Sequence, residues 1–275
     1  MLIDKQTQEQ LRAKYNPDGS KIREMQMAMK NILDVVDEVC VKNDIPYWLC
    51  SGTLIGAVRH GGFIPWDDDL EIDMLRSDIP RFIEACKRDL PEGYVIQNHS
   101  TDKNYYLNIV KVRQLGTEVR EALTFKDGTD TAASYNYKGY FIDIIPIEPS
   151  KYRLVKLAGK SNALLISAIF HWHLPKFIIE LIYRVNLLIY SLFRFISMLV
   201  ADKNKCYVTY GSWFYKPRYL NDIFPLQRIE FEGSMYNAPK DTHAYLSKIY
   251  KDYTKLPEDA LRVPMHDTNL NNAQE

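Results

Sequence analysis

The sequence has no excess of either charge and no long uncharged apolar run. Its 35 Lys and Arg residues balance its 35 Asp and Glu residues, so the formal net charge is zero. Binding to DNA or RNA relies on a basic surface that neutralises phosphates, so this balance argues against general nucleic-acid binding. No stretch reaches the roughly 18 uncharged apolar residues that a membrane-spanning helix requires.

Cysteine is also scarce. The four cysteines, at positions 40, 50, 86 and 206, form neither a CxxC pair nor a zinc-ligand spacing. We expect reduced, mostly buried thiols in a cytoplasmic protein. The first ten residues, MLIDKQTQEQ, lack the basic and then apolar pattern of a secretory leader, so we expect no cleaved leader.

What the sequence does have is a row of carboxylates. They occupy every second position from Asp67 through Asp69 and Glu71 to Asp73. In a strand, this alternation places them on one face, roughly 6.5 Å apart. Gathered carboxylates raise one another's pKa unless a cation is present, and Mg²⁺ or Mn²⁺ prefers such oxygen ligands. A solvated acidic turn is the simpler alternative, but the apolar residues between the acids favour an open metal site.

The preceding residues 46–62, PYWLCSGTLIGAVRHGG, are typical of a short strand followed by a helix. The strand ends at Ser51 and Gly52, and small residues at a helix start let a phosphate approach free backbone N–H groups. Arg59 lies further along that helix and is either a phosphate ligand or a surface cation. With the acids close behind, the stretch predicts a site for a nucleotide di- or triphosphate.

Together these motifs, SGTLIGAVRHGGFIPWDDDLEIDM, resemble the signature of the LicD family, the phosphocholine transferases of bacterial surface glycans. Fukutin and the fukutin-related protein are distant animal relatives of that family. The resemblance covers about residues 20–266. It implies an α/β (α+β) fold with a nucleotidyltransferase-like mixed sheet flanked by helices, similar to the polymerase β superfamily.

The resemblance also implies roles for individual residues. Asp69 and Glu71 fall where the paired metal-binding acids belong. The family usually has Asp at the second position, and the longer Glu71 side chain suits octahedral Mg²⁺ less well. Residues of the same motif that are expected to contact substrate are Ser51, Gly52, Thr53, Arg59 and Trp66.

Asp143 stands alone in residues 139–147, GYFIDIIPI, which otherwise have the pattern of a buried strand. A charged carboxylate there costs several kcal/mol without a partner. It either caps a neighbouring element or completes the metal site. A third acid from a neighbouring strand is typical of polymerase-like folds, which favours the metal site.

Residues 104–113, NYYLNIVKVR, alternate as a strand does. The alternation places Lys111 and Arg113 on one face, two residues apart. The family carries similar basic residues here, so both are candidate ligands of the donor phosphates. Two solvated cations at a strand end are the alternative.

Residues 154–200 are far more apolar than the rest of the chain. Lys176, Glu180 and Arg184 follow at four-residue steps and mark one polar stripe on an otherwise apolar helix. The segment either lies in a membrane interface or packs on the core as a helical hairpin. The family's acceptors are often carried on lipids, which favours peripheral contact with the inner face of the cell membrane.

These patterns divide the chain into four parts. They are a catalytic core over residues 1–153, an apolar helical insertion over 154–204, a C-terminal part of the catalytic domain over 205–266 and a disordered tail over 267–275. The C-terminal part carries five aromatic residues that form either a wall for a sugar or trimethylammonium group or ordinary packing: Tyr207, Tyr210, Trp213, Phe214 and Tyr215.

The resemblance implies transfer of phosphocholine, or a similar phospho-linked head group, from a CDP-linked donor to a hydroxyl of a glycan or lipid-linked glycan. Asp69, Glu71 and Asp143 would hold Mg²⁺ or Mn²⁺, and Asp143 or Asp67 would accept the hydroxyl proton. Two alternatives remain open. One is a nucleotidyltransferase that adds a nucleoside monophosphate to a small molecule, and the other is a non-catalytic scaffold for glycan assembly.

Overall fold

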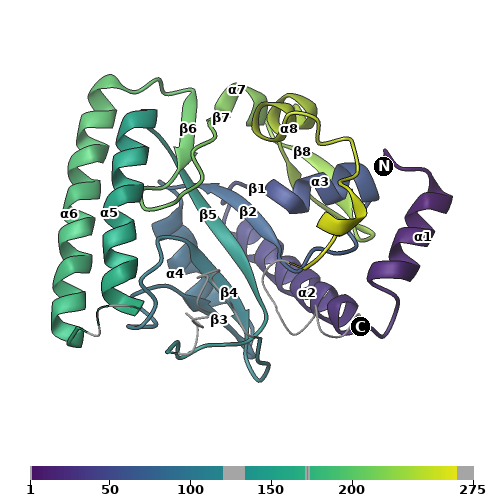
Figure 1. The fold of residues 1–275 in the computed structure, drawn as a ribbon, viewed down its shortest axis with the longest axis horizontal. Helices are drawn as coiled ribbons and strands as arrows, with labels where there is room; N and C mark the ends of the chain where they lie inside the picture. The colour runs from purple at the N-terminus through teal and green to yellow at the C-terminus, as the bar shows by residue number, and fades with distance from the viewer. Residues whose placement is uncertain (1, 120–133, 171, 173, 265–275) are drawn as a thin grey trace.

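The computed structural model describes residues 2–119, 134–170, 172 and 174–264 (Figure 1). The tail over 267–275, which the sequence predicts to be disordered, lies outside these residues. Helices α2 (Lys21–Lys42) and α4 (Ile79–Asp89) pack beside a central mixed sheet, and a pair of long helices stands at one end of it.

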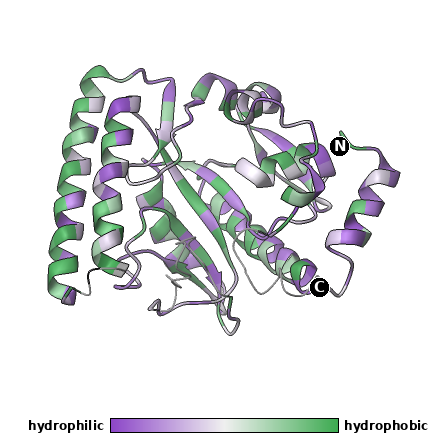
Figure 2. Cartoon of the chain, in the orientation of Figure 1, coloured by the Kyte–Doolittle hydropathy of each residue, from purple (hydrophilic) through white to green (hydrophobic). Residues whose placement is uncertain are grey.

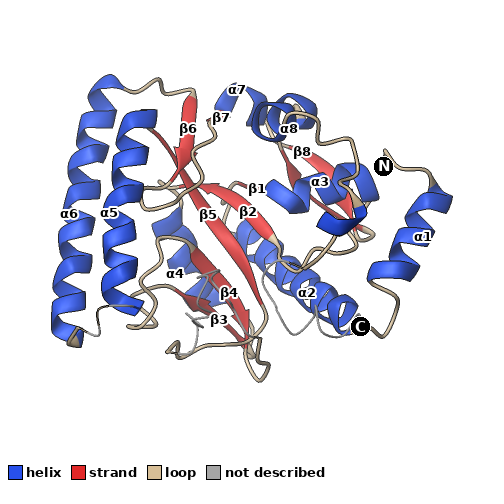
Figure 3. Ribbon diagram, viewed as in Figure 1, coloured by secondary structure: helices blue, strands red, loops and turns tan. Residues whose placement is uncertain are grey.

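Within the part of the chain that the structure describes, the central sheet has seven strands. Five follow the order β1 (Tyr47–Leu49), β2 (Glu71–Leu75), β5 (Phe141–Pro149), β4 (Val110–Gln114) and β3 (Tyr94–Gln97). The carboxyl-terminal half of β5 also pairs with β6 (Lys205–Val208), which pairs with β7 (Arg218–Tyr219). Only β2 and β5 run parallel among these pairs. Figure 3 shows the helices and strands of the fold. The predicted mixed sheet flanked by helices is confirmed.

Apolar residues at helical spacing predict a helix over residues 19–43, and α2 forms there. The side chain of Ser20 accepts a hydrogen bond from the backbone N–H of Arg23 and caps the helix. Val41 near the end of the helix is exposed, while the apolar residues that carry the helical spacing are buried: Ile22, Met25, Met29, Ile32, Leu33, Val36 and Val39. Helix α2 therefore provides much of the core beneath β4 and β5.

The strand predicted over 104–113 begins only at Val110. The backbone N–H of Asn104 donates to Asp102 Oδ1 at 3.0 Å, and the Asn104 side-chain amide donates to the Ser134 carbonyl at 2.6 Å. Such side-chain bonds compete with strand pairing. The prediction of a strand was therefore wrong for residues 104–109 and confirmed for 110–113.

The C-terminal part adds a hairpin and a short helix. Strands β8 (Gln227–Phe231) and β9 (Ser234–Ala238) are joined at Glu232 and Gly233, which have φ angles of 50° and 77°. The Glu-Gly pair in the sequence predicts a two-residue hairpin turn, and the left-handed conformation of both residues confirms it. Helix α7 (Leu220–Ile223) precedes the hairpin, and α8 (Thr242–Tyr250), capped by the Asp241 side chain, follows it.

The first and last described segments meet. Helix α1 (Lys5–Tyr15) contacts the short 3-10 helix Asp259–Leu261 through Lys14, whose Nζ lies 2.6 Å from Asp259 Oδ2. This ion pair is exposed on both sides, so it contributes little to stability.

The apolar segment folds as two helices, α5 (Tyr152–Phe170) and α6 (Lys176–Val200), which pack side by side (Figure 1). The hairpin that the sequence predicts is therefore present, while the division into four domains stays a prediction. Among the described residues, neither helix is long and apolar enough to cross a bilayer.

Candidate active site

Three charged side chains form a row across neighbouring strands. Glu71 on β2 is the register partner of Asp143 on β5, and Asp143 is the partner of Lys111 on β4. Register partners point to the same face of a sheet and lie about 5 Å apart at their Cα atoms. The Lys111 Nζ atom lies 2.7 Å from Asp143 Oδ1. The structure thus brings together two predicted metal ligands and one predicted phosphate ligand.

Helix α3 (Ser51–His60) begins beside this row and ends at Gly61, which has a left-handed φ of 71°. The Thr53 hydroxyl accepts a hydrogen bond of 2.9 Å from the backbone N–H of Glu71. The first turn of α3 is thereby fixed to the start of β2. Its backbone N–H groups have no intrahelical partners and suit an anion.

Asp67 lies against that first turn. A Cβ atom on Gly52 would stand 2.6 Å from Asp67 Oδ2, so only glycine lets the carboxyl group pack so closely. Burial raises the pKa of Asp67 well above its usual range, and the nearby Asp69, Asp68 and Glu71 raise it further. Asp67 also shares a side-chain hydrogen bond with Asp69. The carboxylates are thus crowded enough to favour a proton or a cation among them.

The sequence predicts that the four acids lie on one strand, and the structure differs. A turn at Pro65 and Trp66, closed by the Asp67 N–H that donates to the Ile64 carbonyl at 2.9 Å, leads into residues 67–70, which are not in a strand. The Gln26 side chain donates to the Asp67 carbonyl at 2.9 Å. Strand β2 begins at Glu71. The prediction of a continuous strand from Asp67 was therefore wrong.

Asp73 shares the strand face of Glu71 but has a different environment. It is fully buried, and its Oδ2 accepts from Arg218 Nε at 2.5 Å and from the Tyr245 hydroxyl at 2.6 Å. A buried carboxylate held by these two donors is a structural group. It fixes β7 and α8 to β2, next to the charged row.

Arg59 is buried rather than exposed. Its Nη1 donates to the carbonyls of Tyr253 and Lys255 at 3.0 Å each, and its Nε donates to His60 Nε2 at 2.9 Å. The surface-cation interpretation is therefore wrong. These bonds give Arg59 a structural role, and a phosphate contact by this residue stays a prediction.

Arg113 and Trp66 are buried as well. Arg113 donates to Gln97 Oε1 at 2.5 Å and to the Gly139 carbonyl at 2.7 Å, and it packs on the Phe141 ring. Trp66 makes edge contacts with Tyr15 and His60. Both support the frame of the site, and their contact with substrate stays a prediction.

The donor set fits a hard divalent cation, because Asp69, Glu71 and Asp143 supply carboxylate oxygens beside a crowded Asp67. Within the described residues, however, no three acidic, histidine or cysteine side chains are gathered as a ready-made metal site. In this structure the Asp143 carboxylate is turned to Lys111. Binding a cation between β2 and β5 therefore requires these side chains to rearrange.

Tyr250, at the end of α8, was not identified from the sequence as a site residue. Its hydroxyl shares a hydrogen bond with Ser51, and its pKa is raised by burial and next by the nearby Glu71. Only the tyrosine-rich character of the C-terminal stretch hinted at it. The residue comes from far along the chain, which a local motif cannot show.

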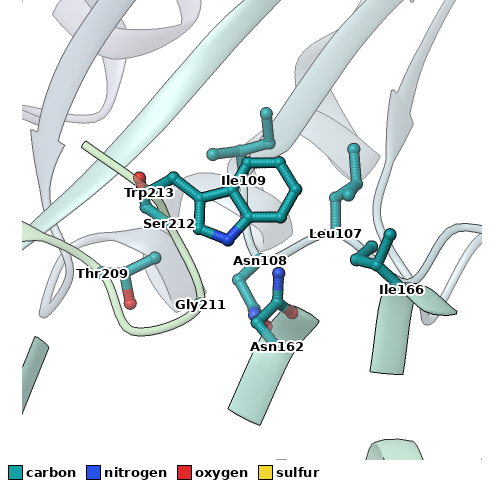
Figure 4. A pocket seen from close by; sticks show the side chains of 9 residues that line it. All are labelled: Leu107, Asn108, Ile109, Asn162, Ile166, Thr209, Gly211, Ser212 and Trp213. Atoms are coloured by element: carbon teal, nitrogen blue, oxygen red, sulfur yellow. The ribbon is translucent and has the colours of Figure 1, made fainter. Parts of the chain in front are cut away.

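The five C-terminal aromatic residues do not form one wall. Tyr207 and Tyr210 are buried against α5 and α6, and Phe214 packs near Tyr250. Trp213 instead lines a small pocket of about 170 Å³ with Asn108 and Asn162 (Figure 4). Packing explains the two buried tyrosines, and the exposed Trp213 indole is the group still open to a ligand.

The mixed sheet, the first turn of α3 and the acids on β2 and β5 are consistent with a nucleotidyltransferase-type domain. Residues 44–151 match the family model of the LicD/FKTN/FKRP nucleotidyltransferase domain. Over these residues the chain is similar to the LicD/FKTN/FKRP family.

Similar proteins come from both bacteria and animals. The chain is 29% identical over 271 residues to the lipopolysaccharide cholinephosphotransferase LicD of Haemophilus influenzae, which covers 89% of this chain and 96% of that protein. An uncharacterized protein of Rickettsia prowazekii, RP689, is 44% identical over 116 residues, or 35% of this chain and 42% of that protein. The ribitol 5-phosphate transferase FKRP of Homo sapiens is 33% identical over 58 residues, or 21% of this chain and 11% of that protein.

Proposed function

We propose that the protein transfers a phospho-linked head group from a CDP-linked donor to a hydroxyl of a glycan or lipid-linked glycan. The observation that carries the proposal is the row of Glu71, Asp143 and Lys111 beside the first turn of α3. The similarity to a cholinephosphotransferase over nearly the whole chain supports the same reaction and favours phosphocholine as the head group.

The donor diphosphate would lie between the start of α3 and the charged row. Backbone N–H groups at Ser51, Gly52 and Thr53 would bind phosphate oxygens at the positive end of the helix dipole. Lys111 would supply a positive charge to the oxygens that become more negative during transfer. Arg113 would hold the β4 backbone in place beneath Lys111, through its bonds to Gln97 and Gly139.

Asp69, Glu71 and Asp143 would hold Mg²⁺ or Mn²⁺, which when bound neutralises charge on the diphosphate and on the departing CMP. A carboxylate must also accept the proton of the attacking hydroxyl. Asp143 is the stronger candidate because its side chain is 17% exposed beside Lys111, whereas the Asp67 carboxyl group packs against Gly52. Release of Asp143 from Lys111 would free both groups for these roles.

Phosphorus NMR of the protein with CDP-choline, Mg²⁺ and a glycan acceptor tests the proposal. We expect Mg²⁺-dependent conversion of the donor to CMP, and a loss of at least about a hundredfold in Asp69→Asn and Asp143→Asn. Asp18→Asn, at a side chain that is 94% exposed beside Arg12, is the matched control and should retain activity.

Each other outcome has a defined meaning. Conversion of CDP-ethanolamine but not CDP-choline would keep the reaction and change the head group. Release of pyrophosphate from a nucleoside triphosphate would indicate a nucleotidyltransferase instead. Failure to bind any nucleotide, with or without Mg²⁺, would favour a scaffold.

A further inference from the structure

Helix α6 is apolar on two opposite faces. One face is buried, with Tyr183, Tyr190 and Phe193 packed toward α5 and its neighbours. The opposite face carries an exposed series of large apolar residues at steps of four and three, which align as one stripe along a helix. This α6 stripe consists of Phe177, Leu181, Val185, Leu188, Leu192, Phe195 and Leu199.

The α6 stripe is long and well exposed. Phe177 is 74% exposed and Leu188 is 70% exposed. From its first to its last residue the stripe runs for roughly 33 Å along the helix. Figure 2 shows α6 as hydrophobic along most of its length. Soluble monomers rarely expose a continuous apolar surface of this extent, so the stripe requires an external partner.

The charge around the α6 stripe shows what kind of partner fits. Residues 151–203 contain eight Lys and Arg residues and two Asp and Glu residues, a net charge of +6, although the whole chain is neutral. One of the two acids, Glu180, already pairs with Arg184 at 2.9 Å and with His99 at 3.2 Å. The exposed cations of this segment thus attract an anionic surface.

A pocket at the end of α6 also combines apolar and positively charged residues. It has a volume of about 800 Å³, and Met198, near the end of the stripe, lines it. Arg76, Arg194 and Lys203 line the same pocket beside apolar walls, together with Glu148, which pairs with Arg194 at 2.7 Å and with Arg76 at 3.6 Å. Three cations against one acid leave the pocket positive, and with its apolar walls this suits an amphiphile that has a phosphate head group.

We propose that the α6 stripe docks into the interface of an anionic lipid bilayer, with the cations of residues 151–203 against the head groups. A second copy of the chain is a poorer occupant, because pairing through the stripe would oppose two segments of +6 each. The proposal rests on the outer face of α6 and does not depend on the transfer reaction at β2 and β5.

Vesicle flotation with the full chain tests it. We expect binding to vesicles that contain phosphatidylglycerol and much weaker binding to pure phosphatidylcholine. Leu188→Glu/Leu192→Glu should weaken binding at least about tenfold, because it places charge in the apolar layer. Val41→Glu, at an exposed apolar residue on α2, is the matched control and should bind as the wild type does.

Lys156→Glu/Lys160→Glu tests the charge separately and should reduce both binding and its sensitivity to salt. Donor binding, measured without vesicles, should be unchanged in every variant, so failure here is distinct from failure of the proposed reaction. Equal binding by the stripe variant and the wild type would overturn the proposal. A dimer detected by light scattering and lost in Leu188→Glu/Leu192→Glu would overturn it in favour of a second copy.

Discussion

Gly52 and Asp67 pack so closely that a side chain at position 52 would collide with the carboxyl group: a Cβ atom there would lie 2.6 Å from Asp67 Oδ2. This contact fixes Asp67 against the first turn of α3, where we place the donor phosphates.

Gly52→Ala should therefore reduce turnover more than it reduces stability. The added methyl group displaces Asp67 and its neighbour Asp69, and we expect turnover to fall at least about tenfold, as displacement of positioned groups does. Gly116→Ala is the control, because Gly116 has a φ of 74° and open space around it. It should lose about 1 kcal/mol of stability through strain and keep its activity. Equal turnover in the two variants would contradict the prediction.

The ion pair between Lys111 and Asp143 predicts a second effect. Lys111→Met leaves the Asp143 carboxylate without its cation, and Lys111 is only 3% exposed. We expect the free energy of unfolding to fall by about 3 kcal/mol, the lower end of the range for a broken buried pair. Urea denaturation measures it. Lys111→Met/Asp143→Leu should recover part of the loss, and a single variant as stable as the wild type would show that the pair is not coupled.

Asp73 and Arg218 predict a purely structural effect. Their side chains are 0% and 1% exposed, and Arg218→Met would leave Asp73 buried without its cation. We expect a loss of about 3–5 kcal/mol in the free energy of unfolding. Arg228→Met is the control, because its pair with Asp37 is 41% exposed at the arginine and should be worth less than about 1 kcal/mol. Similar losses in both variants would argue against the buried pair as a main support of the C-terminal part.

Local patterns predicted local structure well. The periodicity of α2 and the Glu232–Gly233 turn depend on neighbouring residues, and both appear as expected. The strand predicted from Asp67 did not form. The Asp67 carbonyl there is bound by Gln26, a residue distant in the sequence.

Contacts between residues distant in the sequence also determine the arrangement of the site. Asp143 and Lys111 could each be selected from a strand pattern, but their pairing follows from the register of β4 and β5. Tyr250 reaches Ser51 only because α8 packs beside α3. Contacts of this kind are set by tertiary packing, and one sequence does not display them.

His60 predicts a dependence of stability on pH. Burial, with a smaller effect of Arg59, lowers the pKa of His60 to about 3 in the folded protein. The unfolded chain therefore takes up a proton below about pH 6.5 while the folded protein does not, so stability falls as the pH falls.

The contribution of His60 to this slope is about 1.4 kcal/mol per pH unit below pH 6.5. His60→Gln should remove it, so the stability difference between pH 7 and about pH 5 should shrink by about 2 kcal/mol relative to wild type. His243→Gln, on an exposed side chain, controls for the substitution itself. An unchanged slope in His60→Gln would contradict the assignment.

The most direct test of the central claim follows the phosphorus next to the head group. Wild type is incubated with Mg²⁺, a glycan acceptor and CDP-choline that is labelled at this phosphorus, beside Asp143→Asn. We predict that the label appears on the acceptor in amounts equal to the CMP released, and that Asp143→Asn forms neither product. Label that remains in a free phosphocholine product while CMP becomes attached to the acceptor would contradict the claim, as would full transfer by Asp143→Asn.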